Sequence, residues 1–257
     1  MHDWLAEQTR RNLAVRGQWQ AFESHRQRVT ALLAEVAGQH RRSNLCLLGA
    51  GNCNDVNLQE LIDCYEALHL VDCDGDALAR GIERQGLGRR PSLTMLGEID
   101  LLGLADCPPS ATSAELAAAA LNHQPLQNFK PVEVVASLCV LSQLLEAAAS
   151  RCPSRSASHL ELLQAVRYRH LRLLVELLRP GGCGLLITDL VSSVSARDLD
   201  VVGDEQLPAL VSRWVSEHNF FTGLNPAVVL ASLQDDPWMA AHVKNVQPLG
   251  PWKWDLG

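Results

Sequence analysis

Several features that would point to other protein classes are missing from this sequence. No Gly-Lys pair occurs among its 257 residues, so the phosphate-binding loop G-x-x-x-x-G-K-[ST] is excluded. No two of the eight cysteines form a C-x-x-C pair, which argues against a zinc site. A net charge of −7 argues against nucleic acid as the main partner, because phosphate binding requires a basic face.

Long apolar runs are missing as well. None approaches the roughly 20 residues that cross a bilayer, so no membrane partner is expected. The first 17 residues are polar and lack the apolar core of a signal peptide. We therefore expect a cytoplasmic, reducing location, with free cysteines in place of a disulfide framework.

The composition predicts one α/β domain with additions. The chain is 47% apolar and 20% charged, which is ordinary for a protein with a full core. Residues 1–42 have helical character, with apolar residues at three-to-four spacing between Trp19 and Val36, and are predicted to form a lid or cap. Residues 43–257 alternate strand and helix patterns and are predicted to form the ligand-binding domain around a mainly parallel sheet.

The segment Asn44 to Asp74 carries most of the information. The apolar run ending at Leu48 stops at Gly49-Ala50-Gly51, a helix-like segment follows, and a second apolar run ends in Asp72. Glycines let the backbone approach a ligand where a side chain would collide. A carboxylate at the end of the next strand can accept both hydroxyls of a ribose. This order of elements predicts a nucleotide pocket.

Two nucleotide types remain after the P-loop is excluded. A dinucleotide site requires G-x-G-x-x-G, but Asn54 stands at the third glycine position. S-adenosylmethionine (SAM) has no pyrophosphate, so a looser glycine pattern is compatible with it.

The chain resembles the class I SAM-dependent methyltransferases between Asn44 and Val191. Five segments appear in the family's order: LGAGNCND, HLVDCD, LTMLGEIDLLG, VEVVASLCVLSQLL and LLRPGGCGLLITDLV. Two positions depart from the family pattern. Leu47 replaces an acid that contacts the methionine amine, a role that Asn52, Asn54 or Asp55 would have to fill, and Cys53 replaces the third glycine.

The resemblance implies a three-layer α/β sandwich with a seven-stranded sheet. Its last two strands would form a hairpin in the tail, with the final strand antiparallel. It also implies SAM as the cofactor. Asp72 matches the residue that holds the ribose, and Glu98, beside Ile99, matches the acid near the adenine amine. The residues expected to bind the cofactor are Gly49, Ala50, Gly51, Asn52, Asn54, Asp72, Cys73, Glu98, Ile99, Ser137 and Leu138.

Methyl transfer requires no fixed catalytic triad, because the sulfonium is already a good leaving group. A general base is needed only if the attacking atom carries a proton. Candidates are Asp189, at the end of an apolar strand, and the imidazoles of His25 and His218. Each also has an ordinary structural explanation, as a turn cap or as a core or surface histidine. Trp19, Trp214 and Trp238 are candidates for an acceptor pocket, although aromatic residues at helical spacing more often belong to the core.

We expect a methyltransferase that acts on a small molecule, because the chain is acidic and carries no separate recognition domain. Two alternatives stay open: an NAD(P)-dependent oxidoreductase built on the same strand–turn–helix unit, and a non-catalytic protein of the same fold. The sequence does not determine the acceptor, the methylated atom or the oligomeric state. A homodimer is one of the possible states.

Overall fold

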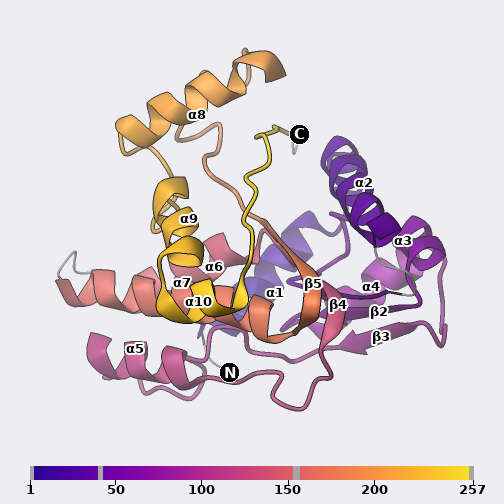
Figure 1. Cartoon of the computed structure of the whole chain (residues 1–257), viewed down its shortest axis with the longest axis horizontal. Helices are drawn as coiled ribbons and strands as arrows, with labels where there is room; N and C mark the ends of the chain where they lie inside the picture. The colour runs from indigo at the N-terminus through magenta and orange to yellow at the C-terminus, as the bar shows by residue number, and fades with distance from the viewer. Residues whose placement is uncertain (1–2, 40–42, 153–156, 255–257) are drawn as a thin grey trace.

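A single parallel sheet organises the molecule. The structure, a computed structural model, describes residues 3–39, 43–152 and 157–254. Five strands lie in the order β3-β2-β1-β4-β5, and every neighbouring pair is parallel (Figure 1). The strands are β1 (Asn44–Leu48), β2 (Ala67–Val71), β3 (Leu93–Leu96), β4 (Val132–Leu138) and β5 (Leu178–Ile187).

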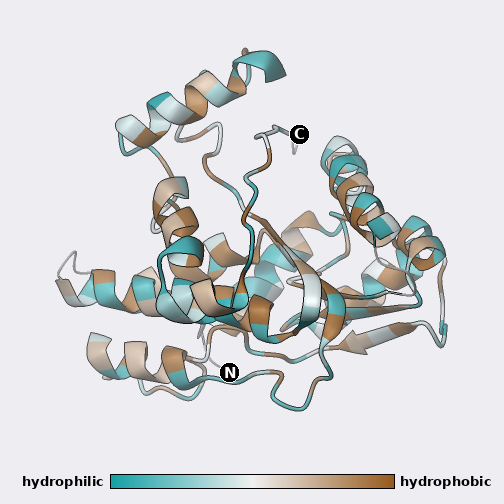
Figure 2. Cartoon of the chain, in the orientation of Figure 1, coloured by the Kyte–Doolittle hydropathy of each residue, from teal (hydrophilic) through white to brown (hydrophobic). Residues whose placement is uncertain are grey.

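Helices cover both faces of the sheet. In β1, Leu45 and Leu47 belong to one core cluster and Cys46 and Leu48 to the other, as the two-residue period of a strand requires. Most strand residues are apolar, as expected for a sheet buried on both faces (Figure 2). The first cluster includes residues of α2 (Glu23–Gln39), α3 (Leu58–Cys64) and α4 (Gly75–Arg84), and the second includes residues of α5 (Ser113–Asn122), α6 (Val140–Arg151) and α7 (Ala157–Glu176).

The N-terminal region forms two helices. α1 (Asp3–Val15) is followed by a turn, and α2 begins at Glu23, so the helical pattern predicted from Trp19 starts four residues late. Residues 1–2 and 40–42 of the predicted helical region lie outside the described residues. α1 reaches α4 across the carboxyl ends of the strands, whereas α2 packs on α3.

The expectation of seven strands with an antiparallel last strand is wrong. After β5 the described chain forms a short 3₁₀ turn (Asp204–Gln206), then α8 (Leu207–Ser216), α9 (Pro226–Gln234) and α10 (Pro237–His242). Each of these three α-helices has a proline in its first turn, a position that favours helix initiation. The tail contains Pro248 and Pro251, which lack the N–H that a ladder requires, and 243–254 has no regular structure.

The tail instead packs beside α2. Trp252 and Trp254 contact the core cluster that includes α2, and the Lys253 ammonium donates to the carbonyls of Leu199 and Val202. Among the described residues, no helix combines the length and the apolar character that crossing a bilayer requires.

Strand β5 differs from its predicted form. The sequence Arg179–Gly182 predicts a turn before a strand at Cys183, but Leu178 already pairs with Val132. The register then shifts, and Cys183 pairs with Val134, so the Pro-Gly-Gly segment forms an irregularity within β5. The order of the strands changes direction between β1 and β4, and that switch point marks the expected binding crevice.

Candidate functional site

The turn after β1 is bare main chain held against the end of β2. The N–H groups of Gly49 and Ala50 both donate to the Val71 carbonyl, at 2.9 and 3.1 Å. Gly49 has a φ of +76°, and a Cβ there would lie 2.5 Å from the Val140 Cβ. Gly51 has a φ of +45°, so both positions favour glycine. The turn therefore keeps the shape that lets a ligand approach the backbone.

Asp72 follows β2 and faces this turn. Its Oδ2 accepts the Gly51 N–H at 2.8 Å, and its Oδ1 accepts the Asp74 N–H at 2.9 Å. Burial raises the pKa of the Asp72 carboxyl, and these two hydrogen bonds oppose the rise. Each carboxylate oxygen has a second lone pair, so Asp72 can accept further hydrogen bonds from a ligand.

A cavity of about 610 Å³ opens over the carboxyl ends of the strands. Its volume lies in the range of small-molecule sites. Most of the predicted cofactor-binding residues line it: Gly49, Gly51, Asn52, Asn54, Asp72, Cys73, Ile99 and Leu138.

Three predicted residues lie outside this lining. Ser137 is fully buried, and its Oγ hydrogen-bonds His170 Nε2 of α7 at 2.8 Å. Ala50 packs in the core cluster of α2–α4. Glu98 has a φ of +60° and an exposed side chain, while its neighbour Ile99 lines the cavity. The strand ends are where the sequence indicates, but the direction of each side chain depends on packing that the sequence pattern does not reveal.

Helix α1 covers the cavity. Its lining residues recur on one helical face: Trp4, Gln8, Arg11, Asn12 and Val15. Sequence analysis did not identify these five residues as part of the site, although their spacing is a signal for a shared face.

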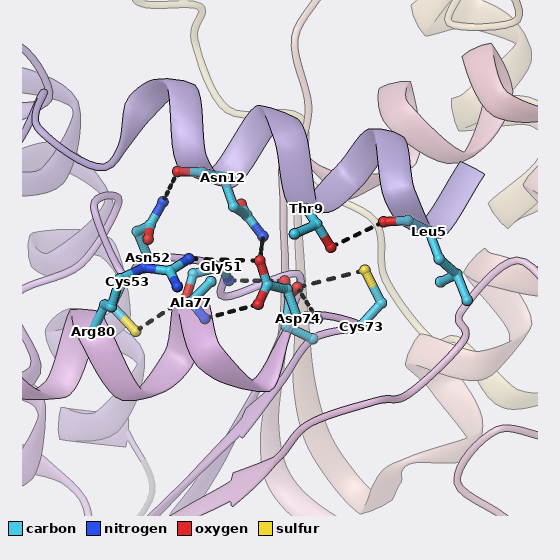
Figure 3. Close-up of polar contacts among 11 residues, drawn as sticks. Leu5, Thr9, Asn12, Gly51, Asn52, Cys53, Cys73, Asp74, Ala77 and Arg80 are labelled. Carbon is cyan, nitrogen blue, oxygen red and sulfur yellow. Dashed lines mark hydrogen bonds and ion pairs between the residues drawn. The ribbon is translucent and has the colours of Figure 1, made fainter. Parts of the chain in front are cut away.

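Asn12 connects α1 to the cofactor side of the cavity. Its Nδ2 donates to Asp74 Oδ2 at 3.2 Å, and its backbone carbonyl accepts from Asn52 Nδ2 at 2.6 Å (Figure 3). Figure 3 shows α1 crossing over the glycine turn, with Asn12 directed toward Asp74. Helix α1 and the glycine turn therefore share a hydrogen-bond network.

Asn52 and Asn54, which follow the glycine turn, differ in whether their side-chain amides are fully hydrogen-bonded. Asn54 is fully engaged, because its Nδ2 donates to the Val15 carbonyl at 3.0 Å and its Oδ1 accepts from Arg84 at 2.8 Å. Asn52 is only 3% exposed, and its Oδ1 has no hydrogen-bond partner among the described residues. A buried acceptor without a partner is destabilising unless a ligand supplies the donor. Of the two, Asn52 is therefore the better candidate for a polar contact with a ligand.

The opposite end of the cavity contains a second carboxylate. Asp189 follows β5 and lines the cavity, and its Oδ2 accepts from Ser142 Oγ at 3.2 Å. Burial raises the pKa of the Asp189 carboxyl, and the negative charge of Asp55 adds to the rise. A carboxylate with a raised pKa in a cavity is a suitable proton acceptor.

His25 is fully buried beside Asp55 and does not line the cavity itself. Its Nε2 lies 3.0 Å from Asp55 Oδ1, and its Nδ1 accepts from Trp252 Nε1 at 3.0 Å. The Trp254 ring lies 4.1 Å from the imidazole. His25 is thus separated from the cavity by Asp55, which does line it.

His25, Asp55 and Cys139 place ligand atoms within 4.8 Å of one another, as a metal site would. The Trp252 hydrogen bond argues against that use. A neutral imidazole that accepts at Nδ1 carries its proton at Nε2, so Nε2 has no lone pair for a metal. In addition, burial raises the pKa of the Cys139 thiol well above its ordinary value, which disfavours the thiolate that metals bind.

The remaining candidates lie away from the cavity. His218 is exposed just after α8, with a φ of +57°. Trp214 is buried in the core, Trp19 lies under the Arg26 guanidinium, and Trp238 stacks on His242. The aromatic residues that do line the cavity are Trp4, Phe22, Phe221 and Trp254.

The helix after the glycine turn is not placed to bind a pyrophosphate. Dinucleotide folds use a helix that opens directly from the turn. Here α3 begins only at Leu58, and its first N–H groups are occupied: Asn57 Oδ1 accepts from Gln59 and Glu60, and Gln85 accepts from Leu58.

No protein-family model and no curated protein matches this sequence. Several of the solved structures to which it is similar are named as methyltransferases. The N-methyltransferase NodS of Bradyrhizobium japonicum WM9, with bound S-adenosyl-L-homocysteine (SAH), is 15% identical over 72% of this chain and 78% of its own, with a TM-score of 0.39.

Two further structures are similar at the same level. DesVI of Streptomyces venezuelae is 13% identical over 77% of this chain, with a TM-score of 0.36. CalS10 of Micromonospora echinaspora, an amino pentose methyltransferase with bound SAM, is 14% identical over 62% of this chain, with a TM-score of 0.35. This chain spans 60% of DesVI and 50% of CalS10. Such distant similarity does not assign a function, which must be argued from the cavity.

Proposed function

We propose that this chain is a SAM-dependent methyltransferase that acts on a small molecule. One observation carries the proposal: the bare turn Gly49–Gly51 and the Asp72 carboxylate border the same cavity and are hydrogen-bonded to each other. A ligand in that cavity can contact the main chain of the turn and the Asp72 carboxylate at the same time. A nucleoside that carries a polar chain requires both contacts.

The residues present fit SAM along its length. Asp72 retains lone pairs for two ribose hydroxyls. Ile99 and Leu138 offer apolar contact for the adenine, and both line the cavity. The unpaired Oδ1 of Asn52 offers an acceptor for the methionine ammonium.

SAM supplies a methyl group already activated by the sulfonium. The protein's contribution is to align the acceptor and exclude water, and proximity of this kind can supply about 7–11 kcal/mol of the barrier. α1 excludes water by covering the cavity, and we propose that it opens to admit ligands. Asp189 is placed to take a proton from an acceptor that carries one.

The proposal of a small-molecule acceptor rests on how far the protein encloses the cavity. The cavity is covered by α1 on one side and bordered by Trp254 of the tail. A macromolecule would have to reach the methyl group through this cover. The oxidoreductase alternative is weakened by α3, whose N-terminal N–H groups are occupied by Asn57 and Gln85.

Isothermal titration with SAM, SAH and NAD tests the proposal. We expect one SAM or SAH per chain and no heat from NAD. NAD binding without SAM binding would favour the oxidoreductase. SAM binding without transfer of labelled methyl to any of a panel of small amines, phenols and acids would favour the non-catalytic protein.

A further inference from the structure

The charges that line the cavity are unbalanced. Four carboxylates line it, those of Asp55, Asp72, Glu146 and Asp189, whereas Arg11 is the only cationic side chain among the described lining residues. Arg11 is already paired with Glu146, at 2.9 Å, and with Glu7, at 3.3 Å. Asp72 is assigned to the cofactor under the proposed function, so the excess negative charge comes from Asp55 and Asp189.

These two carboxylates belong to one group of side chains. Asp55 and Asp189 each raise the pKa of the Cys139 thiol, and Asp55 raises that of Asp189. Of the neighbouring groups, His25 is neutral in the tautomer fixed by Trp252. Arg26 offsets one charge, but it donates to the carbonyls of Trp19 and Asn54. Arg26 is also shared with Glu23, so positive charge does not fully offset the two carboxylates.

The aromatic residues of the lining also favour a positively charged ligand. Phe22, Phe221 and Trp254 line the cavity, and the face of an aromatic ring attracts a cation. The unpaired oxygen of Asn52 is likewise an acceptor, nine-tenths buried in the cavity wall. Negative charge therefore exceeds positive charge in the cavity lining, which suits a ligand that brings a positive charge and hydrogen-bond donors.

We infer that the methyl acceptor is an amine that enters as its ammonium form and is held by Asp55 and Asp189. This inference rests on the proposed function and specifies its substrate class. The ammonium gives one proton to the Asp189 carboxylate, which leaves a lone pair on nitrogen. That lone pair forms the N–C bond to the methyl carbon as the S–C bond breaks, and the electron pair of the S–C bond stays on sulfur. The products are a methylated ammonium and a neutral thioether.

The test uses three probes of similar shape and different charge: phenethylamine, 2-phenylethanol and 3-phenylpropanoate. Each is titrated into protein saturated with SAH. We expect the amine to bind about tenfold more tightly than the alcohol or the acid, as the loss of one charge-assisted hydrogen bond predicts. Equal binding, absent amine binding, or a preference for the alcohol or the acid overturns the inference.

Variants locate the binding groups. Asp189→Asn and Asp55→Asn should each weaken phenethylamine binding about tenfold, with SAH affinity changed less than about threefold. Asp63→Asn, an exposed acid on α3, is the matched control and should change neither. Amine binding that is indifferent to both cavity variants overturns the inference. If one variant unfolds, the relative affinities of the wild-type protein for the three probes still show whether the cavity prefers a positively charged ligand.

The SAH titration separates two kinds of failure. If SAH does not bind, the proposed function fails. If SAH binds but the amine is not preferred, the methyltransferase proposal stands and the amine inference alone fails.

Discussion

The N–H of Gly51 donates to Asp72 Oδ2 over 2.8 Å, which joins the turn after the first strand to the carboxylate after the second. The two residues are 21 positions apart in the sequence, and adjacent parallel strands bring them together. The bond holds the carboxylate at the cavity edge, where Asp74 and Cys73 also contact it. The arrangement is organised by the protein itself before any ligand binds.

Replacing Asp72 with alanine should weaken SAH binding about tenfold or more, because two ribose hydroxyls lose their acceptor. Binding of 5′-methylthioadenosine, which has the same ribose, should weaken equally. Titration calorimetry measures both. Asp76→Ala, an exposed acid on α4, is the control. Unchanged affinity in the Asp72 variant would mean that the ribose lies elsewhere.

The role of Asn52 predicts a different pattern across the same two ligands. Asn52→Ala should weaken SAH binding about fivefold to tenfold, because the methionine ammonium loses an acceptor. It should leave 5′-methylthioadenosine unaffected, since that ligand has no ammonium. Equal losses for both ligands would instead indicate that Asn52 acts only by holding α1 through the Asn12 carbonyl.

The cover formed by α1 predicts a change in hydrogen exchange. Asn12→Ala removes the bond to Asp74, so the amides of α1 should exchange faster in the variant than in the wild-type protein. Saturating SAH should slow exchange in α1 of the wild-type protein if the helix closes over the ligand. Exchange in α1 that SAH leaves unchanged would count against a lid.

His170 predicts how stability depends on pH. Burial lowers the pKa of its imidazole to about 4, against about 6.5 for an unfolded chain. Between these values the unfolded chain binds more protons, so stability falls as pH falls from 6.5 to 4, by about 3 kcal/mol for this group.

Urea unfolding at pH 7 and pH 4.5 checks this expectation. His170→Gln should show a smaller loss on acidification than the wild-type protein, since the carboxyl groups titrate in both. An equal loss in the two proteins would assign the acid sensitivity to other groups. SAH affinity at pH 7 should be unchanged, because neither His170 nor its partner Ser137 lines the cavity.

Trp252 predicts the protonation state of His25. Long-range ¹⁵N–¹H spectra should show the His25 proton on Nε2, and micromolar Zn²⁺ should not bind stoichiometrically. Trp252→Phe keeps an aromatic ring but removes the donor, so the Nδ1–H tautomer should become populated. A proton on Nδ1 in the wild-type protein, or one tightly held Zn²⁺ lost in His25→Ala, would contradict this assignment.

Much of the sheet could be predicted because β1, β2 and β4 are short apolar runs, and β1 and β2 are followed directly by Gly49 and Asp72. β1, β2 and β4 lie close to where the apolar pattern indicates. The last strands could not be predicted from the resemblance, because the chain after β5 is rich in helix-initiating prolines. Local sequence outweighed the pattern implied by the family there.

Within the candidate site, main-chain positions were more predictable than side-chain directions. The glycine turn and Asp72 follow from strand ends, which the sequence marks clearly. Ser137 also ends a strand, yet it turns toward His170, because α7 presents a buried imidazole on that face. The contribution of α1 depends on how a distant helix docks, and Trp254 arrives from a tail with no periodic pattern.

The most direct test is a crystal structure of the protein with SAH. We predict that the ribose hydroxyls lie within hydrogen-bond distance of the Asp72 carboxylate and that the homocysteine portion lies along the main chain of Gly49–Gly51. A nucleoside bound elsewhere, or in this cavity with Asp72 unengaged, would contradict the account.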